Sequence, residues 1–176
     1  YSNGAIATQC FGWDGINTAA PAFQNAGNWV GVLFAVQAVG SVIWATIIPR
    51  FKSYKMAYFV SLVLGGIGFI STMFIHDQYM LFVSYILIGC AWAAMLALPF
   101  TILTNSISGK NMGTYLGLFN GTICLPQIIA ASIGGVLLSL VGGAQVNMLV
   151  LAGILLILGA ASVFIIKETS AEKADK

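Results

Sequence analysis

Side chains able to do acid–base, metal or nucleophilic chemistry are scarce in this sequence, and they form no recognisable set. The single histidine, His76, stands beside Asp77 in a segment of three residues with no third partner. The three cysteines, Cys10, Cys90 and Cys124, are widely spaced, and the last two lie in apolar runs, where a free thiol behaves as a small hydrophobic side chain. We therefore expect no enzymatic site, no metal site, no cofactor and no disulfide framework.

Two amide side chains within an apolar run are stronger candidates for a binding role. At 100° per residue, Asn120 and Gln127 share one helical face, and every other residue on that face is small or polar. These residues are Gly113, Gly117, Cys124, Ala131, Gly134 and Gly135. The opposite face carries the large apolar residues Leu118, Leu125, Ile129 and Val136. Amides are costly in hydrocarbon unless they meet polar partners or water, so we expect them to line a cavity or to bond between helices.

Glycines and prolines in the same runs predict how the helices pack and bend. Gly113 and Gly117 have the small-xxx-small spacing that lets helix backbones approach closely. Pro99 and Pro126 each remove a backbone donor inside an apolar run. Transporters use such interrupted helices for binding and gating, although a plain packing kink is the alternative.

An aromatic ring beside an amide suits sugar binding, because the C–H faces of a sugar stack on the ring while its hydroxyls bond to the amide. The sequence offers Trp92 in the middle of one run and Gln37 in another. Gln37 shares its helical face with Gly40, Ser41 and Trp44, and Trp44 lies near a helix end, where we expect a headgroup anchor.

The composition indicates the environment of these residues. The chain has 176 residues, of which 59% are hydrophobic and 7% charged, against roughly 25% charged in soluble proteins. Five apolar runs are long enough to cross about 30 Å of hydrocarbon as helices. They are residues 26–48, 56–75, 79–103, 112–141 and 146–166, and none contains Asp, Glu, Lys, Arg or His. With no alternating pattern that could close a barrel, we predict an all-α integral membrane bundle of five transmembrane helices.

The charges outside these runs predict the topology. All seven basic residues lie in alternate connecting segments: Arg50, Lys52, Lys55, Lys110, Lys167, Lys173 and Lys176. The segments on the other side carry only Asp14, His76 and Asp77. By the positive-inside rule the N-terminus lies outside the cell and the C-terminus in the cytoplasm. We expect a multi-pass protein of the plasma membrane, with a bacterial inner membrane as the setting.

The two ends of the chain complete the predicted organisation. Residues 1–25 combine glycine, proline and small polar residues, which indicates an extracytoplasmic loop or the end of a helix that begins upstream. Residues 167–176 are a charged cytoplasmic tail. No basic patch points to nucleic acid.

Three stretches resemble one family of carriers. Residues 113–130, GTYLGLFNGTICLPQIIA, look like the eleventh helix of the glycoside/pentoside/hexuronide cation symporters of the major facilitator superfamily, bacterial relatives of plant sucrose transporters. Residues 92–103, WAAMLALPFTIL, resemble their tenth helix, and residues 25–31, NAGNWVG, resemble the start of their eighth. Plant sucrose carriers have Gly-Val-Arg where this chain has Gly27, Asn28 and Trp29. The positively charged arginine side chain of those carriers is therefore absent here.

The resemblance implies the C-terminal half of a twelve-helix carrier whose N-terminal half lies before Tyr1. The implied function is symport of a sugar, a glycoside or disaccharide, with a proton or sodium ion, and Gln37, Trp92, Asn120 and Gln127 would contact the sugar. The spans hold no carboxylate and no histidine, so the coupling residue is expected in the other half. The alternatives are a carrier of a non-sugar substrate, a non-transporting bundle subunit and a membrane enzyme.

Overall fold

The computed structural model describes residues 1–106 and 112–165, and every regular element in these two ranges is a helix. Lys110 and the predicted tail at 167–176 lie outside them. Five helices are long and apolar enough to cross a membrane, which confirms the predicted all-α bundle. They are α2 (Pro21–Ile47), α3 (Tyr54–Ser71), α4 (Leu81–Ser106), α5 (Met112–Leu140) and α6 (Gln145–Ser162), with the 3-10 turns η1 (Ile48–Arg50) after α2 and η2 (Val163–Ile165) after α6.

Helix boundaries differ from the apolar runs by a few residues. The largest difference is at α2, which begins at Pro21 instead of residue 26. Proline favours the first turn of a helix, where its missing N–H would have no partner, and Ala20 before it is extended, with ψ of 141°. The polar residues Gln24 and Asn25 therefore belong to the helix although they lie outside the apolar run.

A further helix, α1 (Ser2–Phe11), occupies part of the segment 1–25, so this segment is not a loop throughout. It ends at Gly12, whose left-handed φ of 66° lets its N–H bond to the carbonyl of Ala7. Ile6 and Ala7 are buried in a core shared with Leu33 of α2 and Leu81 of α4. Helix α1 is therefore an integral part of the bundle.

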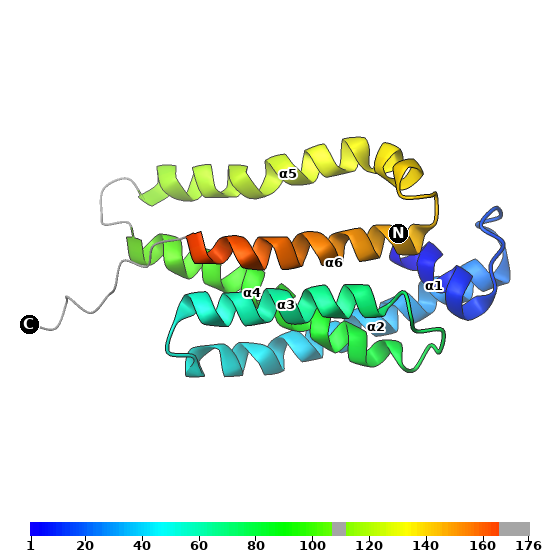
Figure 1. Cartoon of the computed structure of the whole chain (residues 1–176), viewed down its shortest axis with the longest axis horizontal. Helices are drawn as coiled ribbons and strands as arrows, with labels where there is room; N and C mark the ends of the chain where they lie inside the picture. Colours follow the sequence, from blue (N-terminus) through cyan, green and yellow to red (C-terminus); the bar gives the residue numbers. More distant parts are fainter. Residues whose placement is uncertain (107–111, 166–176) are drawn as a thin grey trace, which may run out of the picture.

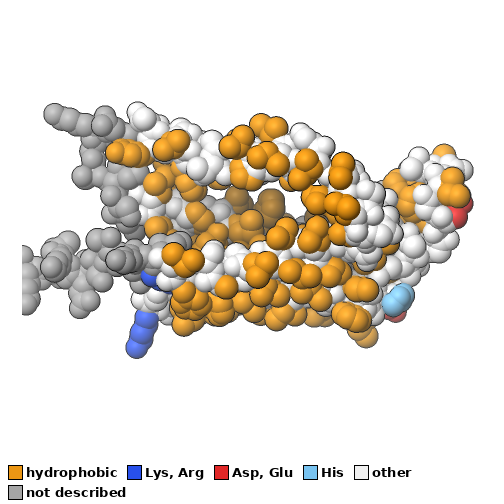
Figure 2. All heavy atoms as spheres, turned by 45° about the horizontal axis from the view of Figure 1, so that its top comes forward, with side chains coloured by type: hydrophobic (Ala, Val, Ile, Leu, Met, Phe, Trp, Pro, Cys, Tyr) orange, Lys and Arg blue, Asp and Glu red, His pale blue; other side chains and the backbone are white. Residues whose placement is uncertain are grey.

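Four of the long helices pack tightly and one stands apart. Helix α4 lies against both α2 and α3, and α3 also lies against α6 (Figure 1). Helix α5 meets the others mainly near its C-terminal end, where it turns into α6. Of its residues only Gly134 is buried. Figure 2 shows that the molecule is hollowed between α5 and the other helices.

Small residues set the closest approaches between the packed helices. A Cβ placed on Gly89 of α4 would overlap the carbonyl oxygen of Gln37 in α2, and one on Gly153 of α6 would lie 2.8 Å from the carbonyl oxygen of Gly66 in α3. The Ser41 hydroxyl lies 2.9 Å from the Gly89 carbonyl oxygen, so α2 also bonds to α4. Since lipid tails are as apolar as leucine, such close packing and interhelical hydrogen bonds must hold the bundle together.

The charged side chains divide between the two ends of the bundle. The described Lys and Arg side chains, Arg50, Lys52 and Lys55, lie at the end where η1 leads into α3. Asp14, His76 and Asp77 lie at the opposite end (Figure 2). Among the described residues, the basic side chains and the acidic ones are therefore separated in space as well as along the sequence.

The two glycines of α6 provide a matched test of this packing. Gly153→Ala should lower the free energy of unfolding by about 1–3 kcal/mol, because the new Cβ overlaps the backbone of Gly66. Gly159→Ala should leave stability equal or higher by up to about 1 kcal/mol, because a Cβ there meets no atom within 4 Å and alanine favours the helix. Unfolding in detergent, followed by tryptophan fluorescence, measures both. Equal effects of the two substitutions would contradict the packing described here.

Candidate functional site

The four residues predicted to contact substrate come from three helices. Gln37 lies half-buried on α2, Trp92 is 52% exposed on α4, and Asn120 and Gln127 are exposed on α5. No hydrogen bond or ring contact joins any two of them, and none of their side-chain polar groups bonds to another described residue. They are therefore free to meet water, a ligand or another part of the protein.

The polar face of α5 is turned toward the bundle. Gly134 belongs to the same helical face as Asn120 and Gln127, and a Cβ on it would lie 2.9 Å from the Tyr1 hydroxyl oxygen of α1. The opposite face holds some of the most exposed apolar side chains of the helix, including Leu118 and Leu125. By helical periodicity, Asn120 and Gln127 therefore face the hollow between α5 and the other helices.

The predicted packing glycines of α5 have no neighbour in this structure. A Cβ on Gly113 or Gly117 would meet no atom within 4 Å among the described residues. The prolines leave their helices continuous: α4 runs through Pro99, and α5 through Pro126. Packing at these glycines and gating at these prolines stay predictions.

The face of α2 that carries Gln37 is partly a packing surface. Gly40 lies against the backbone of Ile86, and Ser41 bonds to α4. The indole N–H of Trp44 donates to the Ser61 hydroxyl oxygen on α3 at 2.8 Å, and Ser61 is fully buried. Trp44, expected to anchor in the headgroups, thus has its polar atom satisfied inside the bundle.

Helix α1 adds polar groups that sequence reasoning did not single out. The side chain of Asn3 lies beside Gly27 of α2, and its Oδ1 is the one buried side-chain nitrogen or oxygen among the described residues that has no hydrogen-bond partner. The small polar composition of residues 1–25 was the only signal, and it does not distinguish a buried helix from a loop.

The thiol of Cys10 in α1 is not activated. Burial, and to a lesser extent the Asp77 carboxylate, raise its pKa above the ordinary value. A nucleophilic cysteine needs a lowered pKa, because the thiolate is the reactive form. Among residues 1–106 and 112–165, no three His, Cys, Asp or Glu side chains are placed to hold a metal ion.

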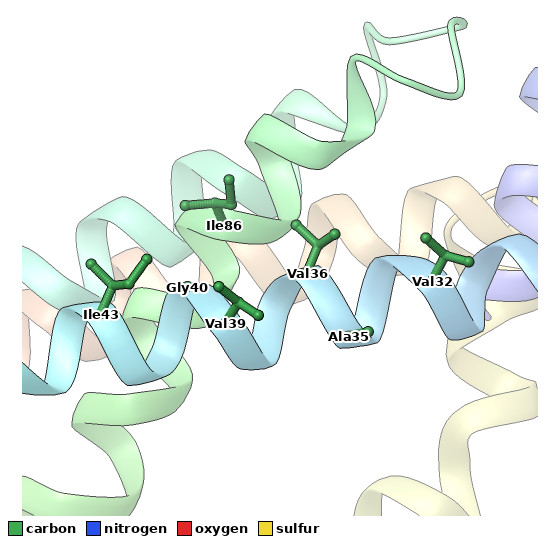
Figure 3. Close-up of a pocket in the computed structure, with 7 residues that line it drawn as sticks. All are labelled: Val32, Ala35, Val36, Val39, Gly40, Ile43 and Ile86. Carbon is green, nitrogen blue, oxygen red and sulfur yellow. The ribbon is translucent and has the colours of Figure 1, made fainter.

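An apolar groove of about 290 Å³ runs between α2 and α4 (Figure 3). It offers no side-chain hydrogen-bonding group, so it cannot orient a polar ligand. Its lining residues are Val32, Ala35, Val36, Val39, Gly40, Ile43 and Ile86. This groove is separate from the polar face of α5.

Comparison with known proteins gives one family and one curated relative. The profile of the family described as Major Facilitator Superfamily matches residues 4–176. The chain is 28% identical over 125 residues to a protein named "Magnetosome protein MamH" from Paramagnetospirillum magneticum. The matched stretch covers 70% of this chain and 29% of that protein, so the chain spans less than two thirds of the relative's length. No solved structure matches the chain.

Stability measurements can separate packing groups from free polar groups. Ser61→Ala should lower the free energy of unfolding of this chain in detergent by about 1–3 kcal/mol, because it leaves the partly buried Trp44 indole N–H without its acceptor. The double variant Asn120→Ala, Gln127→Ala should change it by less than about 0.5 kcal/mol, since no described residue bonds to either amide. A comparable loss in both variants would show that the amides hold helices together.

Proposed function

The chain belongs to the major facilitator superfamily, and from this premise we propose that it is part of a secondary active transporter that carries a sugar, a glycoside or disaccharide, in symport with a cation. Membership of this family supports a lipid bilayer as its setting and a small molecule as the substrate of the whole carrier. An enzymatic role does not fit this family. The sugar, the cation and the site residues are the proposal developed below.

One observation supports the proposal most: the polar face of α5 is directed at a hollow, and its amides Asn120 and Gln127 bond to no described residue. An amide facing hydrocarbon costs free energy, so a face with two of them is stable only against water or polar groups. The large apolar residues on the opposite face of α5 suit lipid. Helix α5 would thus divide a water-filled cavity from the bilayer, with Asn120 and Gln127 as hydrogen-bonding groups for a ligand.

The substrate class rests on two kinds of support. The motif resemblance of residues 113–130 and 92–103 is to sugar carriers. The exposed ring of Trp92, together with the amides of Gln37, Asn120 and Gln127, supplies the apolar stacking surface and the hydrogen bonds that a sugar needs. The name of the magnetosome relative states no substrate. A non-sugar substrate is therefore the alternative, and an uptake assay must distinguish it from a sugar.

The rest of the carrier would supply what these helices lack. The five spans hold no Asp, Glu or His side chain, so the group that couples a proton or sodium ion would lie in the N-terminal half. Gly113 and Gly117, open in this structure, would take a helix of that half in close packing. Pro99 and Pro126 would let α4 and α5 bend as access alternates between the two sides of the membrane.

Sugar uptake by the complete carrier tests the site directly. Asn120→Ala combined with Gln127→Ala should lower uptake at least tenfold, because the substrate loses two hydrogen-bonding partners worth about 1.4 kcal/mol or more together. Leu118→Ala combined with Leu125→Ala, on the opposite face of the same helix, should keep uptake within twofold. Radiolabelled sugar uptake into cells, normalised to the amount of carrier in the membrane, gives both values. Full uptake by the amide variant would remove these residues from the site.

The proposed orientation follows from the segregated charges. We place the end with Arg50, Lys52 and Lys55 in the cytoplasm and the end with Asp14, His76 and Asp77 outside, in the plasma membrane. The tendency of Lys and Arg residues to stay on the cytoplasmic side of a membrane supports this direction.

Cysteine labelling of intact cells tests the orientation. With the native cysteines replaced by alanine, Asp77→Cys should react with a membrane-impermeant maleimide, whereas Lys52→Cys should react only after the cells are permeabilised. Both positions lie in exposed turns, so a difference between them reports sidedness and not burial. Labelling of the Lys52 position in intact cells would reverse the orientation.

A further inference from the structure

A second polar hollow lies at the end of the bundle that carries Asp14 and Asp77. It has a volume of about 240 Å³ and is enclosed by α1, the loop that follows it and the start of α6. Four polar side chains line it: Thr8, Gln9, Asp14 and Gln145. The indole of Trp13 forms part of its wall, and none of the four residues proposed for the central site does. We call it the outer pocket.

The hydrogen-bonding groups of the outer pocket are largely unused. One carboxylate oxygen of Asp14 accepts from the backbone N–H groups of Ile16 and Asn17, and the other bonds to no described residue. The Gln9 amide donates to the Met73 carbonyl oxygen at 3.1 Å, which leaves its own oxygen as an acceptor. The Gln145 amide bonds to no described residue, so both its donor and its acceptor are available. The pocket therefore offers several acceptors, one amide donor and one negative charge.

We propose that the outer pocket binds a polyol the size of one sugar ring on the extracytoplasmic side, as a site separate from Asn120 and Gln127. This inference rests on the proposed function for the class of ligand. The hydroxyls of such a ring would donate hydrogen bonds to Asp14 and Gln9, and would both donate to and accept from the Gln145 amide. The apolar face of the ring would lie on the wall that includes Trp13. The volume is below the roughly 300–1,000 Å³ of sites for drug-sized ligands, so a single ring fits and a disaccharide enters only in part.

The indole of Trp13 is held in a fixed position and is 7% exposed, so it offers the pocket a small part of its apolar surface. Its N–H donates to the Asn17 carbonyl oxygen at 2.8 Å, and its ring lies 4.7 Å from that of Phe23, centroid to centroid. Glycines leave the rim of the pocket open: Gly15 and Gly143 both have positive φ, and a Cβ on either would meet no atom within 4 Å.

Gly4 positions the Gln145 amide. The amide lies over the bare Cα of Gly4, and a Cβ at that position would fall within the amide group itself. Gly4→Ala would therefore push the Gln145 side chain aside without changing its chemistry, and alanine is well tolerated in a helix. This substitution therefore tests whether binding needs the amide in this position, because the amide itself is still present.

Asp14 has a matched counterpart in Asp77, which also caps a turn at the same end. The carboxylate of Asp77 accepts from the backbone N–H groups of Tyr79 and Met80, as that of Asp14 does from Ile16 and Asn17. Asp14→Asn and Asp77→Asn each remove one charge and keep the capping oxygen. Of these two aspartates, only Asp14 lines the pocket.

The test is a titration of the complete carrier with D-glucose, followed by saturation-transfer NMR. The background is Asn120→Ala, Gln127→Ala, which removes the proposed central site. In that background, saturable binding should persist. Asp14→Asn and Gly4→Ala should each raise the Kd at least fivefold, whereas Asp77→Asn should keep it within twofold.

Two results would overturn the outer pocket. One is the absence of saturable glucose binding in the background variant, and the other is an equal response to Asp14→Asn and Asp77→Asn. Neither result bears on the proposed transport function, which is judged by uptake through the carrier with intact Asn120 and Gln127. Failure of the pocket and failure of the transport site are therefore distinguishable.

Discussion

Hydrocarbon cannot form hydrogen bonds, and the rest of this structure depends on that constraint. The backbone of each long segment must satisfy its own polar groups, so the segments are helices. Side-chain hydroxyls bond to carbonyls of their own or a neighbouring helix, as Ser41 does across to α4. The indole of Trp44 finds the buried hydroxyl of Ser61. Where polar side chains have no such partner, as on α5, the same constraint predicts water or a ligand.

Packing in this bundle divides the helices into a tight group and one that stands apart. The backbones of α2 and α4 meet at Gly89, and those of α3 and α6 meet at Gly66 and Gly153. Helix α1 is inserted among them, with Asn3 against α2 and Tyr1 against α5. Helix α5 has no comparable contact along most of its length. This division leaves the hollow that the polar face of α5 borders.

The sequence predicted the fold well because hydrophobic length and charge are one-dimensional signals. Five uncharged runs of about 20 residues located the five long helices, and the alternation of basic residues anticipated the two charged ends of the bundle. The start of α2 was missed because Pro21 follows the preference of proline for the first turn of a helix, and because the polar residues Gln24 and Asn25 interrupt the apolar run. The ten residues of helix α1 are stabilised by contacts with several helices, so the local sequence left residues 1–25 open between a loop and the end of a helix.

The candidate site was only partly predictable for a related reason. Helical periodicity placed Asn120 and Gln127 on one face, but only the contact of Gly134 with Tyr1 shows that this face is directed at the bundle. Periodicity also grouped Gln37 with Gly40 and Ser41, which pack against α4. The outer pocket joins residues from α1, its following loop and α6, so no local pattern could have indicated it. Which helix covers a face depends on tertiary contacts that spacing does not encode.

The native thiol of Cys124 provides the most direct measurement of the central claim that the polar face of α5 lines an aqueous cavity. Cys124 lies on this face between Asn120 and Gln127 and is exposed, whereas Cys90 is buried and Cys10 half-buried. In the complete carrier in membrane vesicles, a small hydrophilic thiol reagent should modify Cys124, and a transported sugar should slow the reaction. A thiol that stays unmodified in intact vesicles but reacts with an apolar reagent would place this face in lipid and contradict the account.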